Sequence, residues 1–239
     1  MAALAVQPIG FNNVSSNCHM NALMQALLTF EEFRRTVQLI PQNLEITINA
    51  GGNDMPMRVI NHLIRTVKDC SLEGGQDSIS VDLFYLIDTF HKNLSNLFLF
   101  EVEKNLKCRG CGHAFKKMDS IHILNPTFDI FNNYLKDYKC DACGRRGTTV
   151  NDYLTVVKYP TILICSANVP GQIPAVAVRQ LGKRRYTLRS LINYPGRAHF
   201  TATVKYPDGK IYYCDDSAVR QTDIILPNAN TLFCFYLLS

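Results

Sequence analysis

The sequence contains four cysteines in two Cys-x-x-Cys pairs, a spacing typical of metal-binding sites. The pairs are Cys108 with Cys111 and Cys140 with Cys143; 28 residues separate them, and a glycine directly follows each pair. A tight turn places both thiolates of a pair on one side of the backbone, and two such turns complete a tetrahedral site. A four-thiolate site leaves no position for a substrate water. The sequence therefore predicts structural Zn²⁺ here and catalysis elsewhere.

Cys18 lies where a loop rich in Asn and Ser gives way to a run with helical periodicity. Ser15, Ser16 and Asn17 are suitable helix caps. A thiol in the first turn of a helix lies near the positive end of the helix dipole, which favours the nucleophilic thiolate. Asn13 lies upstream and could direct its amide toward a developing oxyanion. Because buried cysteines at helix starts are common, spacing alone leaves a core role open.

His199 and Asp215 could supply a general base and the acid that orients it. They are sixteen residues apart on two predicted strands joined by a turn at Pro207–Gly209, and a hairpin places such residues side by side. A hydrogen bond between them would fix the imidazole tautomer. Asp216 could share this role or take it over. Alone, His199 also fits an ordinary half-buried strand histidine.

The elements that must position these residues change in character along the chain. Up to about residue 88 the apolar spacing is mostly helical, at residues 23–30, 59–67 and 82–90. From about residue 96 the pattern favours strands, with candidates at 151–157, 161–166, 199–206, 210–215 and 231–238. We therefore expect an α+β fold in which a helical part precedes a mostly antiparallel β part, with a site in the cleft between them.

Composition limits the functional classes. The chain has 239 residues, of which 47% are hydrophobic and 19% charged, and a net charge of +5. Its short basic clusters lack interleaved aromatic residues, so we expect no nucleic-acid partner. No signal peptide or membrane span is predicted. The paired cysteines suit a reducing compartment, which favours the cytoplasm or nucleus. Cys70, Cys165, Cys214 and Cys234 lie in apolar contexts and are interpreted as core residues.

The segment around Cys18 resembles the cysteine box of the ubiquitin-specific protease family, which reads roughly G-L-x-N-x-G-N-T-C-Y-M-N-x-x-x-Q. The residues that match in register are Gly10, Asn13, Cys18, Met20, Asn21 and Gln25. The departures are Ser15 for Gly, Ser16-Asn17 for Asn-Thr and His19 for Tyr. Ser15 is expected to tighten the oxyanion loop and so to affect the turnover rate.

The segments around His199 and Asp215 resemble the family's second box, G-H-Y-x-A-Y-V followed by W-Y-x-F-D-D-S-x-V. The departures are Ala198 for Gly, Phe200 for Tyr and Ile211 for Trp. By this resemblance His199 is the general base and Asp215 the orienting acid. Ala198 is expected to narrow the passage for a Gly-Gly tail. Gly196 is expected to contact the same tail.

A third stretch, from residue 75 to residue 88, resembles the family's Q-Q-D-A-x-E-F-L helix start. In that alignment Gln76 could contact the substrate tail. The alternative is a capped helix N-terminus without such a role.

The resemblance covers about residues 10 to 238. It implies a single papain-like catalytic domain with a helical thumb (about 1–95), zinc-bearing fingers (about 96–160) and a β palm (about 161–239). It also implies thiol-dependent hydrolysis of isopeptide or peptide bonds after the C-terminal glycine of ubiquitin or a ubiquitin-like modifier. The expected partner is that modifier, and the chain is expected to be monomeric.

Two alternatives remain open at this stage. A viral papain-like protease that processes a polyprotein also combines a helical thumb, a four-cysteine zinc finger and a Cys-His-Asp triad, and the short chain suits it. In that case the protein would act in the host cytoplasm. A catalytically inactive module that binds ubiquitin or scaffolds a complex is the other alternative.

Overall fold

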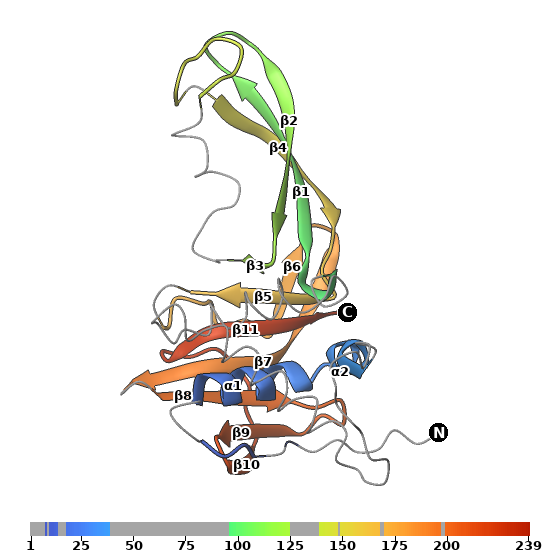
Figure 1. Cartoon of the computed structure of the whole chain (residues 1–239), viewed down its shortest axis with the longest axis vertical. Coiled ribbons are helices and arrows are strands. Elements are labelled where there is room, and N and C mark those ends of the chain that lie inside the picture. Colours follow the sequence, from blue (N-terminus) through green and yellow to red (C-terminus); the bar gives the residue numbers. More distant parts are fainter. Residues whose placement is uncertain are drawn as a thin grey trace, which may run out of the picture.

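Two antiparallel sheets dominate the computed structural model of this chain. The structure describes residues 8, 10–13, 18–38, 96–124, 139–147, 149–167, 170–196 and 199–239. In this part of the chain, one sheet has three strands in the order β2-β1-β4. The other has eight strands, with β10-β9-β8-β7-β11-β5-β3 as its path and β6 paired with β7. Figure 1 shows the smaller sheet extending away from the larger one. The fold is thus mixed and strand-rich, as the α+β prediction requires.

All strands of the larger sheet come from the second half of the chain. Its strands are β3 (Ile123–Leu124), β5 (Ile162–Ser166), β6 (Val178–Leu181), β7 (Arg184–Gly196), β8 (His199–Lys205), β9 (Ile211–Asp215), β10 (Ala218–Thr222) and β11 (Thr231–Leu238). Strand β3 is parallel to β5, and the other described pairings are antiparallel. Consecutive strands from β7 to β10 pair with each other. The hairpin of β8 and β9 therefore places the start of β8 beside the end of β9.

Both faces of the larger sheet are covered, and its central strands are accordingly apolar at consecutive positions. On β11, Phe233 and Phe235 face one core, while Cys234 and Tyr236 face the other. Strand β5 divides its side chains in the same way. Successive side chains of a strand point to opposite faces, so a strand buried on both sides must be apolar throughout.

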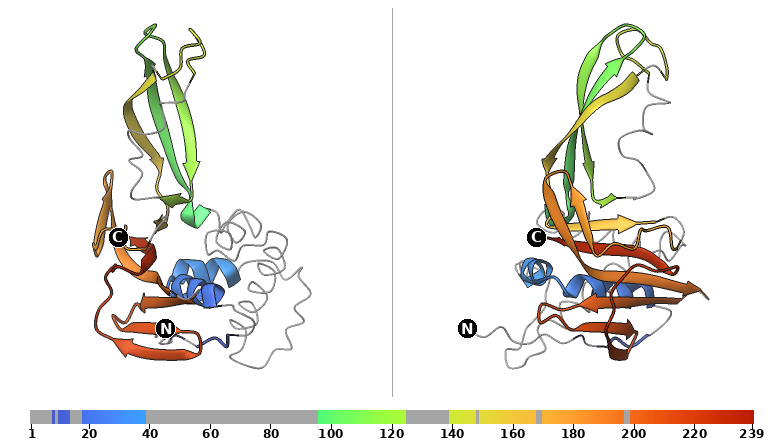
Figure 2. Two further views of the ribbon diagram at one scale, coloured as in Figure 1. Left: turned by 90° about the vertical axis from the view of Figure 1, so that its left-hand side faces the viewer. Right: turned by 180° about the vertical axis from the view of Figure 1, so that it is seen from behind.

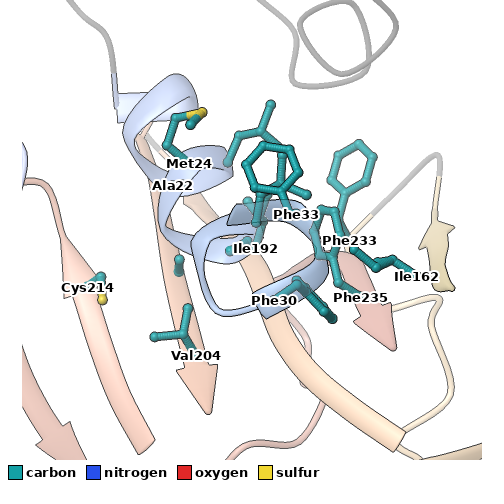
Figure 3. Close-up of a cluster of buried hydrophobic side chains, with 14 of the residues drawn as sticks. Ala22, Met24, Phe30, Phe33, Ile162, Ile192, Val204, Cys214, Phe233 and Phe235 are labelled. Carbon is teal, nitrogen blue, oxygen red and sulfur yellow. The ribbon is translucent and has the colours of Figure 1, made fainter. Parts of the chain in front are cut away.

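One face of the sheet is covered by α1 (Cys18–Leu28) and α2 (Glu31–Gln38). Ten of the eleven residues of α1 are buried, so this helix lies inside the protein rather than on its surface. It packs mainly on β8 and also contacts β7 and β9. Figure 3 shows Phe30 and Phe33 among the side chains that fill the space between the helices and the strands. The core therefore fixes the position of the first residue of α1 relative to the start of β8.

The smaller sheet is formed by β1 (Phe100–Cys108), β2 (Ala114–Ile121) and β4 (Thr149–Lys158). Figure 2 shows that it projects from the larger sheet in both views. A partly buried ion pair between Lys104 and Asp119 joins β1 to β2. At its far end, Cys108 ends β1 and so places a cysteine at the tip.

The structure confirms several of the predicted elements. The helical periodicity from residue 23 belongs to α1, and the five candidate strands correspond to β4, β5, β8, β9 and β11. The predicted turn is present: the Gly209 amide donates to the Tyr206 carbonyl at 2.9 Å, and Gly209 has a φ of 88°. The helices predicted at 59–67 and 82–90 lie outside the described residues. In the described part, no helix is long and apolar enough to cross a membrane.

Strand β7 was missed by the sequence analysis, although it is the longest strand described, at 13 residues. Its charged start, its Pro195 and a break in its alternation hide the strand period. The break is a register shift in its pairing with β11, where Ser190 pairs with Phe235 and Leu188 pairs with Tyr236. Such a shift moves the apolar positions by one residue relative to strict alternation.

Candidate active site and metal centre

The four predicted metal ligands meet at the tip of the smaller sheet. Their sulfur atoms all lie within 4.8 Å of one another. Cys108 Sγ is 3.7 Å from Cys143 Sγ, and Cys111 Sγ is 3.8 Å from Cys140 Sγ. Zinc–sulfur bonds of about 2.3 Å at the tetrahedral angle would place sulfur atoms about 3.8 Å apart. The cluster therefore has the donor set and the dimensions of a four-thiolate zinc site.

The two Cys-x-x-Cys turns have matching backbone hydrogen bonds. The Gly112 amide donates to the Cys108 carbonyl at 2.8 Å, and the Gly144 amide donates to the Cys140 carbonyl at 2.7 Å. These glycines have φ values of 75° and 69°, in the left-handed region that glycine adopts most easily. The glycine after each pair therefore closes the turn that brings the two thiols together.

Cys18 is the first residue of α1 and is buried, with 5% of its surface exposed. The loop residues proposed as caps, Ser15, Ser16 and Asn17, lie outside the described residues. The segment after Cys18 meets the segment after His199, since the rings of His19 and Phe200 are 6.4 Å apart in an edge-on contact. Tyr194 at the end of β7 continues this aromatic group, with its ring centroid 4.9 Å from that of Phe200. Packing of α1 on β8 thus brings the surroundings of Cys18 and His199 together.

His199 and Asp215 form a hydrogen-bonded pair. The Nε2 atom of His199 lies 2.7 Å from Oδ1 of Asp215, and about a third of each side chain is exposed (33% and 40%). A carboxylate accepts from an N–H group, so this contact selects the tautomer with the proton on Nε2. The ring nitrogen left with a lone pair is then Nδ1, which is the atom that could accept a proton.

Asp216 has a different environment from Asp215. It lies in the two-residue turn between β9 and β10, with a φ of 49°. Its Oδ2 accepts from Asn13 Nδ2 at 2.9 Å, and its Oδ1 accepts from Asn21 Nδ2 at 2.7 Å. The carboxylate bonded to His199 is therefore that of Asp215, while both oxygens of Asp216 accept from asparagine amides.

The segment before Cys18 is attached to the same turn. The Phe11 amide donates to the Asp216 carbonyl at 3.0 Å. Gly10 lies so close to the turn that an added Cβ would be 2.3 Å from the carbonyl oxygen of Ser217. No side chain larger than hydrogen fits at Gly10 in this arrangement. The glycine thus allows the close approach that brings Asn13 to Asp216.

The structure brings together most of the predicted site residues that it describes. Asn13, His199, Asp215 and Asp216 share one region of the fold, and Cys18 begins the helix that carries Asn21 into it. Gly196, at the end of β7, pairs with His199 and has a φ of 99°. Gln76 and Ala198 lie outside the described residues, so their predicted contacts with a substrate tail stay predictions.

Asn21 was missed as a site residue, although it matched the cysteine box. A sequence signal was available, because residues three apart lie on the same face of a helix and Asn21 follows Cys18 by three. It is a polar residue with only 3% of its surface exposed. The spacing could not reveal its partner, Asp216, because that residue is 195 positions away in the chain.

Comparison with solved structures places the fold. The chain is similar to a SAGA DUB module in which a Cys-to-Ala variant of Ubp8, with Sgf11, Sus1 and Sgf73, is bound to monoubiquitin. The TM-score is 0.65 at 14% identity, over 97% of this chain and 69% of that chain. For a yeast SAGA DUB module with a variant Sgf73, the TM-score is 0.64 at 14% identity, over 97% of this chain and 68% of that chain. For the Ubp8–Sgf11–Sgf73–Sus1 module, the TM-score is 0.68 at 14% identity, over 97% of this chain and 67% of that chain.

No protein-family model matches the chain, and no curated protein matches it. At this level of identity, the structural similarity shows a fold like that of the deubiquitinase Ubp8.

Proposed function

We propose that this protein is a cysteine-type hydrolase that cleaves isopeptide or peptide bonds after the C-terminal glycine of ubiquitin or a ubiquitin-like modifier. The observation that carries the proposal is the His199–Asp215 hydrogen bond, next to a helix that begins with a cysteine. Its fold is similar to that of a deubiquitinase module solved with monoubiquitin bound. The fold suggests the substrate class, and the paired side chains suggest the chemistry.

The first step assigned to the site is acylation of Cys18. The thiol transfers its proton to Nδ1 of His199, and the sulfur attacks the carbonyl carbon of the terminal glycine. Asp215 stabilises the imidazolium through Nε2. As the tetrahedral intermediate collapses, His199 protonates the departing lysine amine. The carbon–nitrogen bond breaks, and the modifier remains attached to Cys18 as a thioester.

The second step returns the enzyme to its starting state. His199 takes a proton from a water molecule, whose oxygen attacks the thioester carbonyl. The carbon–sulfur bond breaks, and His199 returns its proton to the Cys18 sulfur. The modifier leaves as a carboxylic acid that gives its proton to the solvent. In both steps negative charge develops on the carbonyl oxygen. Asn13 and the backbone amide of Cys18 are the proposed donors to this oxyanion.

The zinc site has a structural role in this proposal. Four cysteines would hold a single Zn²⁺ ion and join the end of β1 to the residues before β4. Because the smaller sheet projects from the core, a metal at its tip would stabilise strands that have few apolar neighbours there. A stable projecting sheet can supply binding energy far from the scissile bond and so position the modifier's tail.

The proposal is tested with a panel of C-terminal electrophile probes built on ubiquitin and its relatives. Wild-type protein is expected to form a covalent adduct with at least one probe, and Cys18→Ala is expected to form none. Cys165→Ala and Cys214→Ala serve as matched controls. Burial raises the pKa of Cys165 to about 11, despite the charge of Arg179, and that of Cys214 to about 12. Both thiols therefore stay protonated near pH 8.

The outcomes separate the possible functions. No adduct with any probe, from protein shown to be folded, would refute the hydrolase. Reversible ubiquitin binding in that same sample would favour the inactive binding module instead. An adduct that persists in Cys18→Ala would show that the nucleophile was assigned wrongly. No observation on the described residues favours the polyprotein-processing or the inactive alternative.

A further inference from the structure

The carboxylate of Asp216 links two segments that are separate in the sequence. One oxygen accepts from Asn21 on α1, and the other accepts from Asn13 in the segment before that helix. The proposed hydrolase assigns a role to Asn13 but none to Asn21. A side-chain amide buried to 97% and directed at a carboxylate in a half-buried turn needs an explanation of its own.

Asn21 is well placed to hold the Asp216 side chain in one orientation. It lies within a buried helix, three residues after Cys18, so its position is set by the core and not by a loop. Its Nδ2 atom is 2.7 Å from Asp216 Oδ1 and 3.5 Å from the Phe11 carbonyl oxygen. The amide therefore contacts both the turn and the segment that leads to Asn13.

The backbone of Asp216 is held as well. Its φ of 49° suits the first position of a two-residue hairpin turn. Its carbonyl accepts from the Phe11 amide at 3.0 Å. With the backbone fixed by the turn, the remaining freedom is rotation of the carboxylate, and the Asn21 bond removes it.

Asn13 is exposed, whereas Asn21 is buried, so the shared carboxylate ties an exposed amide to the buried helix. A side-chain amide carries two N–H hydrogens in one plane. Donating one of them to Asp216 Oδ2 fixes the direction in which the other points. Asn21 on the buried helix thus holds the Asp216 carboxylate in the turn, and that carboxylate in turn holds Asn13 in the exposed loop.

We infer that Asn21 is a positioning residue: it orients the Asp216 carboxylate, which in turn aims the Asn13 amide at the substrate's oxyanion. This inference rests on the proposed function for its final step. It also gives Asp216 a role distinct from that of Asp215. An oxyanion donor stabilises charge that develops only in the transition state, so loss of its orientation lowers kcat while KM changes little.

The test measures kcat and KM on a fluorogenic ubiquitin C-terminal amide for four variants: Asn13→Ala, Asn21→Ala, Asp216→Asn and the Asn13→Ala/Asn21→Ala double variant. Asn13→Ala should lower kcat about 100-fold, and Asn21→Ala about tenfold. The double variant should be no slower than Asn13→Ala alone, because Asn21 acts only through Asn13. Asp216→Asn keeps the shape of the turn and should also lower kcat.

The matched control is Ser190→Ala. Ser190 Oγ donates to the Ala26 carbonyl at 3.0 Å. This is also a buried side-chain bond to α1, but its acceptor lies five residues along the helix from Asn21. This variant should lose stability and keep the wild-type kcat. If Asn21 only stabilises the fold, its kcat loss will multiply with that of Asn13→Ala, and the inference is overturned. An unchanged kcat in Asn21→Ala would overturn it too.

A second measurement separates this inference from the proposed function. The Asn13 side-chain amide signals in ¹⁵N NMR should show slowed hydrogen exchange in wild type and in Ser190→Ala, and faster exchange in Asn21→Ala. If wild-type protein hydrolyses nothing, the function fails while the exchange rates still decide whether Asn21 holds Asn13. Equal exchange in wild type and Asn21→Ala would refute the positioning role even in an active enzyme.

Discussion

Nε2 of His199 lies 2.7 Å from Oδ1 of Asp215, although the two residues are not directly opposed in the hairpin. The paired positions of β8 and β9 end with Ala202 opposite Cys214. One further step would set Thr201 opposite Asp215, so His199 lies two residues beyond that position on the same face. The contact is therefore a diagonal cross-strand pair, within reach of a long aromatic side chain. It leaves Nδ1 as the proton-accepting atom.

Substitutions at Asp215 should separate orientation from charge. Asparagine can still accept from Nε2 through its side-chain oxygen and hold the ring, whereas alanine cannot. We expect Asp215→Ala to lower kcat/KM by about 100-fold or more, and Asp215→Asn by clearly less, since papain-like enzymes use Asn in this position. Steady-state kinetics on a ubiquitin C-terminal amide measures both. Equal losses would mean that the charge, and not the orientation, is what His199 needs.

Gly10→Ala should disrupt the attachment of the segment that carries Asn13. Its Cβ would lie 2.3 Å from the Ser217 carbonyl oxygen, so the backbone must move and weaken the bond from Phe11 to Asp216. We expect a loss of activity in folded protein. Gly209→Ala is the matched control: Gly209 has a φ of 88° and open space around its Cβ position. That variant should lose about 1 kcal/mol of stability and keep its activity. Comparable activity in the two variants would contradict the prediction.

Metal removal should act on the smaller sheet first. Wild-type protein is expected to contain a single zinc ion by elemental analysis, and Cys143→Ser should contain much less. A chelator should lower the melting temperature of wild type and leave that of Cys143→Ser almost unchanged. Cys165→Ser, which changes a buried cysteine outside the cluster, should retain its zinc. Full zinc content in Cys143→Ser would show that the four sulfurs do not form the site.

The Lys104–Asp119 ion pair should stabilise the smaller sheet over the whole neutral range. Burial opposes ionisation of Asp119, but its hydrogen bond to Lys104 and the charges of Lys104 and Lys117 outweigh burial and lower its pKa. A lowered pKa stabilises the fold above the unfolded value of about 3.9, and this contribution is lost only as the pH falls through the folded value.

Asp119→Asn should therefore lower the free energy of unfolding by about 1–3 kcal/mol, because it removes the charge that faces a nearly buried ammonium group. The difference from wild type, measured by denaturant unfolding, should be the same at about pH 5.5 and pH 8. Lys116→Met, which removes an exposed partner of Glu103, should cost less than about 1 kcal/mol. A difference for Asp119→Asn that grows between those two pH values would contradict the assignment.

The sequence by itself determined the parts of the protein that rest on short spacing. The Cys-x-x-Cys turns, the helix that begins at Cys18 and the turn at Gly209 each depend on residues within a few positions of one another. Their hydrogen bonds join residues that are close in sequence, so local spacing is enough to predict them. Strand β7 was not predicted, because its pairing with β11 shifts register and interrupts the local alternation.

Only the tertiary structure decided how the two aspartates differ. Asp215 and Asp216 are adjacent and chemically alike, and either could have bonded to His199. The left-handed φ of Asp216 turns its side chain toward Asn13 and Asn21, while Asp215 stays on the strand face that His199 shares. That outcome depends on a helix packed on the sheet some 195 residues away in the sequence. Contacts of such separation follow from how the core assembles, and no local pattern encodes them.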